Sequence, residues 1–272
     1  MVKLATAREI RKYGSRRSRI RAEYTNAGVY LFSTIVLLCG FIAQFSREPK
    51  SGLVVVLIGL GLMILVNIHD LFAHLAGIDY RFRLMEHDNQ LLFVEVAVPA
   101  LQALGTLLFF IAILLILLQA DRGFGYHRIE THSLKLLIAG TMLWVLGSIH
   151  NSCQIYERAN TNVQILQHSV QIPFLMGSLL FLAGAIVNFQ EQVGHHHHYG
   201  LHLLTYTWVW INIVACSLLV LGGLTNVVKV VKMLQMDGIR LEKLRGGAQE
   251  QLIQDEQTPL LTEEGQIKRS RY

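Results

Sequence analysis

Six long blocks of apolar residues run along the chain, separated by shorter polar stretches. Within each block the apolar side chains are continuous rather than confined to one helical face, which indicates a segment surrounded by lipid. A helix that crosses a bilayer needs roughly 20 apolar residues at about 1.5 Å of rise each. We therefore predict an all-α, polytopic membrane protein with six transmembrane helices. They lie at about residues 26–45, 52–74, 91–118, 134–153, 171–189 and 204–228.

The composition supports this prediction and divides the chain into three parts. Apolar residues make up 52% of the 272 residues and charged residues only 16%, a balance too apolar for an ordinary soluble domain. We expect a basic cytosolic segment at 1–25, a six-helix transmembrane domain at 26–228, and a polar, largely disordered cytosolic tail at 229–272.

Positive charge is concentrated outside the apolar blocks. Eight Lys and Arg residues precede the first block, and a second basic group follows the sixth. This distribution predicts both termini in the cytosol, because cytosolic segments next to membrane spans are enriched in Lys and Arg. The net charge of +5 is thereby explained without a nucleic-acid partner. An Arg-rich organelle transit peptide at 1–22 is the competing interpretation, and the tail described below argues against it.

A helical hairpin recurs three times along the chain. Its first helix opens with similar residues at 33–40, 105–112 and 177–184, at a constant spacing of 72 residues. The second helices correspond at 59–70 and 140–151, with a diverged version at 215–226. We predict three tandem related hairpins in a pseudo-threefold bundle. Small residues of the repeat should let the backbones approach closely: Gly105, Gly140, Gly177 and Gly184.

Residues 177–184, Gly-Ser-Leu-Leu-Phe-Leu-Ala-Gly, resemble the YrhK-like two-helix membrane module. The resemblance covers the short apolar runs of the hairpins. It implies a two-helix membrane unit and no activity, so no site residue is taken from it.

Polar residues recur near the predicted cytosolic ends of the second helices. The repeat places His69-Asp70, His150-Asn151 and Thr225-Asn226 at a similar depth, and the third helix, which starts on the same side, brings Glu95. Ionisable residues are costly in lipid and usually face a bundle interior or a wet cavity. Imidazole with carboxylate suits proton exchange or a divalent transition metal such as zinc. We predict an ion, proton or metal site here, formed by His69, Asp70, Glu95, His150 and Asn151, with His74 and Asn226 as accessory residues.

A structural interpretation of the same residues stays open. His, Asn and Asp are common at the ends of transmembrane helices, where they meet interfacial water or the last free backbone carbonyls. Glu95 lies about one turn inside its predicted helix, so a modest tilt would bring it to solvent.

Two features belong to the predicted lumenal side. Tyr206, Trp208 and Trp210 open the sixth block and are typical of an aromatic belt at the headgroups. The last lumenal loop contains a histidine run that could bind metal weakly or gain charge in acid, although a solvated loop is the simpler interpretation. This run consists of His195, His196, His197 and His198.

The tail contains Glu256-Gln-Thr-Pro-Leu260-Leu261, which resembles the acidic dileucine signal read by clathrin adaptor complexes. An extended peptide could place Leu260 and Leu261 in apolar pockets while Glu256 meets a basic patch. The resemblance implies adaptor complexes as partners and an acidic endosomal, lysosomal or vacuolar membrane as the destination.

Two functions of different classes follow. The first is a small transporter or ion-conducting protein for protons or a divalent metal in an acidic organelle. The alternative is a non-catalytic membrane scaffold or trafficking adaptor. A haem-carrying membrane protein fits less well, because the helices have no second mid-helix histidine pair. Catalytic motifs of membrane hydrolases are absent from the sequence, so we expect no enzyme. We also expect no cofactor beyond such a metal. Assembly into a homo-oligomer stays open.

Overall fold

The computed structural model describes residues 16–46, 48–77, 96–122, 127–152, 161–194 and 204–235. Within these residues the secondary structure is helical, apart from short turns and caps. The helices are α2 (Arg16–Ala43), α3 (Pro49–Gly77), α5 (Val98–Arg122), α6 (His127–Ser152), α7 (Thr161–Gly194) and α8 (Tyr206–Gln235).

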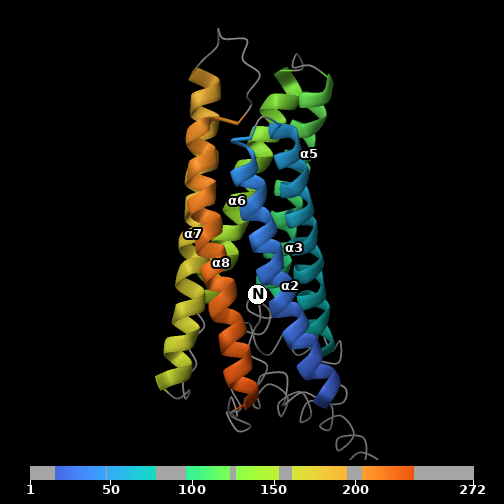
Figure 1. Ribbon diagram of the computed structural model, residues 1–272, viewed down its shortest axis with the longest axis vertical. Helices are drawn as coiled ribbons and strands as arrows, with labels where there is room; N and C mark the ends of the chain where they lie inside the picture. Colours follow the sequence, from blue (N-terminus) through green and yellow to red (C-terminus); the bar gives the residue numbers. More distant parts are fainter. Residues whose placement is uncertain are drawn as a thin grey trace, which may run out of the picture.

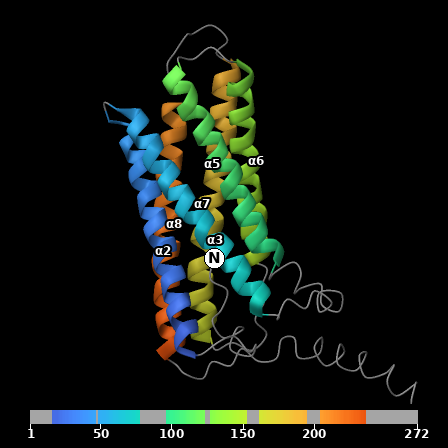
Figure 2. The same cartoon turned by 90° about the vertical axis from the view of Figure 1, so that its right-hand side faces the viewer.

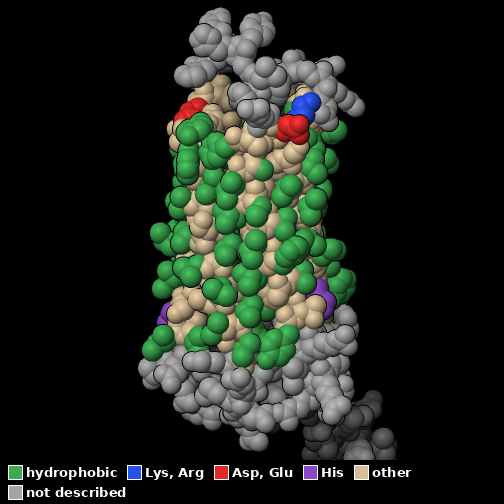
Figure 3. All heavy atoms as spheres, viewed as in Figure 1, with side chains coloured by type: hydrophobic (Ala, Val, Ile, Leu, Met, Phe, Trp, Pro, Cys, Tyr) green, Lys and Arg blue, Asp and Glu red, His purple; other side chains and the backbone are tan. Residues whose placement is uncertain are grey.

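All six helices are long and apolar enough to cross a membrane. Figure 3 shows one face of the bundle, where apolar side chains cover the middle and the visible acidic and basic side chains lie near the upper end. Lipid is the solvent that such a surface fits. The chain is therefore an all-α integral membrane protein, as its sequence predicts. Outward apolar side chains include Phe32, Ile58, Leu65, Phe72, Ile165 and Ile172.

The helices form a closed ring in chain order. Each of α3, α5, α6 and α7 packs against its neighbours in sequence, and α8 closes the ring against α2 (Figures 1 and 2). Successive helices run in opposite directions, so α2 begins and α8 ends at the same end of the bundle, the lower end in Figure 1. We call this the basal end and the opposite one the apical end.

Close backbone approaches within the hairpins involve the predicted small residues. A Cβ atom added at Gly105 would lie 2.8 Å from Gly140 O, and one added at Gly140 would lie 2.7 Å from Gly105 O. At the matching place in α7, a Cβ atom on Gly177 would lie 3.2 Å from Ala215 O. The prediction that these glycines permit close helix packing is confirmed. The three-hairpin repeat stays a prediction, which the ring order and these matched contacts support.

Proline inside α7 explains one divergence between the hairpins. Pro173 has no backbone N–H, so the carbonyl of Ser169 four residues earlier loses its usual helical donor. The Thr225 hydroxyl of α8 lies 3.2 Å from Ser169 O and also 2.9 Å from Gly222 O of its own helix. It can therefore donate to the freed carbonyl, as membrane helices with proline require. Thr225 occupies the position at which the other two hairpins have histidine.

Aromatic side chains form a packed layer inside the helix ring. Phe109, Trp144 and Phe181 pack edge to face with ring centroids 5.2–5.7 Å apart. Phe41 packs against Phe181 and also against Trp208, and the ring centroids of Phe41 and Trp208 are 5.3 Å apart. Trp208 is 1% exposed. Its predicted place in an aromatic belt is therefore wrong. Residues two apart on a helix point in nearly opposite directions, so Trp208 faces the bundle interior while Tyr206 and Trp210 face outwards.

Tyr206 and Trp210 do lie on the outside, 67% and 48% exposed. Both rings pack against Phe45, which lies in the turn just after the apical end of α2, and their centroids are 5.1 Å from that of Phe45. This exposed group at a helix end suits the headgroup region of a bilayer.

Candidate functional site: a polar axis

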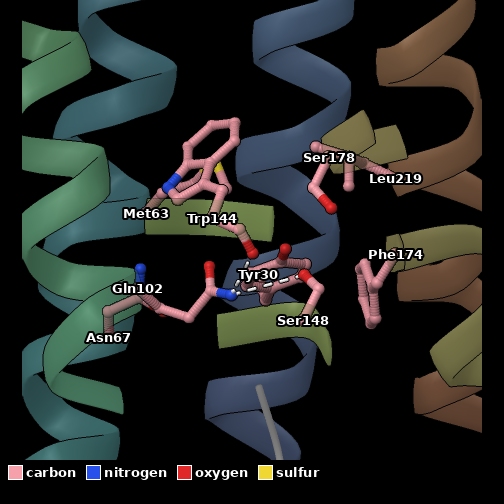
Figure 4. Close-up of a pocket in the computed structure, with 9 residues that line it drawn as sticks. All are labelled: Tyr30, Met63, Asn67, Gln102, Trp144, Ser148, Phe174, Ser178 and Leu219. Carbon is pink, nitrogen blue, oxygen red and sulfur yellow. Dashed lines mark hydrogen bonds between the residues drawn. The ribbon is translucent and has the colours of Figure 1, made fainter. Parts of the chain in front are cut away.

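A small cavity lies inside the helix ring on the basal side of the aromatic layer (Figure 4). Its volume of about 20 Å³ is enough for one water molecule. Residues at matching positions of the three predicted hairpins line it. Tyr30, Gln102 and Phe174 follow one another at 72 residues in α2, α5 and α7, and the second helices contribute Met63, Trp144 and Leu219. The remaining lining residues are Asn67, Ser148 and Ser178.

A hydrogen-bond network at this cavity joins three helices. The Thr106 hydroxyl accepts hydrogen bonds from Trp144 Nε1 at 3.0 Å and Asn67 Nδ2 at 3.1 Å, and it donates to Gln102 O at 2.6 Å. Gln102 Nε2 in turn donates to Trp144 O at 3.2 Å and lies 3.4 Å from Ser148 Oγ (Figure 4). Because lipid offers no alternative partner, these bonds tie α3, α5 and α6 together.

A second polar layer lies two turns further towards the basal end. Asp70, Asn151 and Asn226 each come seven residues after Met63, Trp144 and Leu219, the cavity-lining residues of the second helices. Seven residues are nearly two helical turns, so the two sets share a face and are separated by about 10 Å along each helix. All three are buried, with 1–6% of their surface exposed. We call Asp70, Asn151 and Asn226 the basal ring.

Polar side chains from the first helices of two hairpins, α2 and α7, lie next to residues of the basal ring. Asn26 of α2 is buried, and its Nδ2 lies 3.5 Å from Asp70 Oδ1. Gln171 of α7 donates from Nε2 to the backbone O of Asn151 at 2.8 Å. Asn226 Oδ1 is buried and has no hydrogen-bond partner among the described residues. Lys229, one turn beyond Asn226, is also buried, at 5% exposed.

The two predicted histidines lie apart from this ring. His69 and His150 are exposed on the outer surface, and His150 Nδ1 is 3.0 Å from Leu146 O of its own helix. Adjacent residues on a helix point about 100° apart, so each pair sends its second residue inwards and its histidine outwards. The structure thus places Asp70, Asn151 and Asn226 on the inner faces of their three helices. His69 and His150 lie on the outer surface of the bundle. Figure 3 shows histidine side chains at the rim near the basal end.

The structure does not describe several of the predicted site and sorting residues. Glu95, the histidine run at 195–198 and the tail residues Glu256, Leu260 and Leu261 lie outside the described residues, as does the side chain of His74. Within the described part of the chain, no group of three or more His, Cys, Asp or Glu side chains could hold a metal ion together.

Sequence reasoning missed Asn26, Thr106 and the cavity-facing Tyr30. A signal for Thr106 was present, because Thr34, Thr106 and Ser178 recur at 72 residues and all three are buried. Asn26 gave no such signal, since the matching residues are Val98 and Val170.

No protein-family model, curated protein or solved structure matches this chain. The resemblance to the YrhK-like module therefore stays a prediction.

Proposed function

We propose that this protein is a small membrane transporter or ion-conducting protein whose pathway follows the polar axis of the helix ring. The observation that supports the proposal most strongly is Asp70, a carboxylate that is 1% exposed within the apolar span Pro49–Phe72. An ionisable side chain at the centre of a membrane helix costs about 2.5–3.5 kcal/mol on insertion scales, and less near its end. Such residues usually belong to ion pathways or proton relays.

Two further features favour a pathway. The basal ring and the central cavity lie on one face of the second helices, so polar groups follow one another from the basal end to the middle of the bundle. Phe109, Trp144 and Phe181 then close the axis with a tightly packed apolar layer. Hydrophobic constrictions next to polar cavities are used as gates in channels.

A membrane scaffold is the second candidate. It is favoured by the same aromatic layer and by the small volume of the cavity, which holds only one water molecule. In this function the polar side chains of the axis would only pack the helices together.

The proposed location is an acidic endosomal, lysosomal or vacuolar membrane with both termini in the cytosol. The basic residues at both ends of the transmembrane domain support the orientation, and the dileucine-like segment ending at Leu261 supports sorting by adaptor complexes. The basal end would then face the cytosol.

Ion flux into liposomes that contain the purified protein tests the function. Asp70→Asn keeps the size of the side chain and removes its charge, whereas the double variant His69→Gln/His150→Gln changes the outward neighbours on the same repeated pairs. We expect proton or cation flux in the wild type and the histidine variant, and loss of flux in Asp70→Asn. Absence of flux from folded wild-type protein would favour the scaffold.

A further inference from the structure

The basal ring combines oxygen donors from three helices of one closed bundle. Asp70 comes from α3, Asn151 from α6 and Asn226 from α8, and all three lie on the helix face that also lines the central cavity. The ring residues therefore face the interior of the bundle, about two helical turns to the basal side of the cavity-lining residues of their helices.

Asn226 supplies the independent sign of a ligand. Its side chain is 2% exposed, and Oδ1 has no hydrogen-bond partner within the described residues. An unsatisfied buried carbonyl destabilises the folded protein, and a ligand that accepts its lone pairs removes this cost. Asn226 follows Leu219 by two turns, so this oxygen belongs to the same axial face as Asp70.

The donor set decides which ligand fits. Carboxylate and amide oxygens are hard donors that suit hard cations, whereas transition metals prefer imidazole or thiolate. The imidazoles of His69 and His150 lie on the outer surface. Among the three ring residues Asp70 is the single carboxylate, and buried Lys229 adds a positive charge on α8, one turn beyond Asn226. This charge balance favours a monovalent cation over a divalent one.

We propose that the basal ring is a binding site for an alkali cation such as Na⁺, held by the Asp70 carboxylate and the amide oxygens of Asn151 and Asn226. The proposal rests on the proposed function and names its substrate class. The cation would enter at the basal end and replace part of its hydration shell with these oxygens before it reaches the water-sized cavity.

Binding of ²²Na⁺ to purified full-length protein in detergent, in a choline buffer, tests the site separately from transport. We expect saturable binding in the wild type that excess unlabelled Na⁺ displaces and an equal concentration of Ca²⁺ displaces less well. Asp70→Asn should weaken binding at least about tenfold, since an ionised carboxylate interacts more strongly with a cation than a neutral amide does. Asn226→Leu, which removes the unpartnered oxygen without changing the charge, should weaken it severalfold.

The histidine variant His69→Gln/His150→Gln is the matched control and should bind as the wild type does. Size-exclusion profiles and melting temperatures without Na⁺ identify variants that fail to fold, and Asn226→Leu keeps the test usable if Asp70→Asn is unstable. No saturable binding in the wild type, or binding as tight as that of the wild type in both ring variants, would overturn the proposal. Binding without flux supports the site and refutes transport, whereas proton flux without Na⁺ binding refutes the site and leaves the proposed function standing.

Discussion

Replacement of Gly105 by alanine probes the close packing of α5 on α6. The added Cβ atom would lie 2.7 Å from Trp144 Cδ1 and 2.8 Å from Gly140 O. The second contact is with backbone, which cannot move without shifting α6. Overpacking of this kind costs about 1–3 kcal/mol, while alanine in place of glycine gains up to about 1 kcal/mol of helix propensity. We expect a net loss of about 1–2 kcal/mol.

Gly61→Ala is the matched control, because an added Cβ atom there would meet only Phe110 Cε2 at 4.0 Å. This variant should be as stable as the wild type or more stable by up to about 1 kcal/mol. Gly177→Ala should fall between the two, since its nearest contacts, Leu219 Cδ2 at 3.1 Å and Ala215 O at 3.2 Å, are longer than those at Gly105. The Gly105 and Gly61 variants should differ by about 1–3 kcal/mol, which at about 2–4 °C per kcal/mol corresponds to roughly 2–12 °C in melting temperature.

Thermal unfolding in one detergent, followed by circular dichroism, measures the series. If Gly61→Ala lowered the melting temperature as much as Gly105→Ala, loss of helix flexibility rather than backbone contact would explain both effects. The close-approach argument would then be refuted.

Three other predictions concern separate parts of the chain. Thr106→Val should lower stability by about 1–3 kcal/mol in the same assay, because Trp144 Nε1 and Asn67 Nδ2 both lose their acceptor; unchanged stability would contradict the network. Thr225→Val should cost about 0.6–1.7 kcal/mol, the range for bonds between membrane helices, and less if Pro173 is first changed to alanine, which restores the donor to Ser169 O. Leu260→Ala/Leu261→Ala should move the protein from acidic organelles to the cell surface in fluorescence microscopy, whereas Thr262→Ala should not; unchanged sorting would exclude the dileucine-like signal.

The fold could be predicted because the bilayer imposes a length and an apolar composition on every crossing helix. The same reasoning misjudged the helix ends, which extend into polar regions that the apolar pattern does not reach. For example, α7 begins at Thr161 although its apolar block begins near residue 171. The apolar composition indicates only the part of a helix that lies in the hydrocarbon layer. The backbone hydrogen bonds continue beyond that layer, so the helix is longer than its apolar block.

The site could be predicted only in part, for a geometrical reason. The sequence identified the three repeated polar pairs, but depth along a helix says nothing about direction around it. Asp70, Asn151 and Asn226 are buried while His69 and His150 face outwards, and only the position of each helix in the ring decides this. The polar contacts of Asn26 and Thr106 depend in turn on neighbours from other helices.

The matching of positions around the axis gives a last prediction that tests the ring and the repeat together. If Asp70 and Asn151 occupy equivalent places, the carboxylate should work from either hairpin. The double variant Asp70→Asn/Asn151→Asp should then restore much of the ²²Na⁺ binding that Asp70→Asn loses. Recovery should be incomplete, because Asn26 lies beside Asp70, whereas the residue that matches Asn26 in the second hairpin is Val98.

Adding Val98→Asn supplies the missing amide and should increase the recovery further. The control combines Asp70→Asn with Lys135→Asp, which places a new carboxylate on an exposed face of the same helix α6. It tests for a general effect of negative charge and should restore no binding. If binding returned equally with Lys135→Asp, the cation would be attracted by net charge alone. If the exchange restored nothing while the protein stayed folded, Asp70 and Asn151 would not share one axial site, and the symmetry argued from their spacing would fail at this layer.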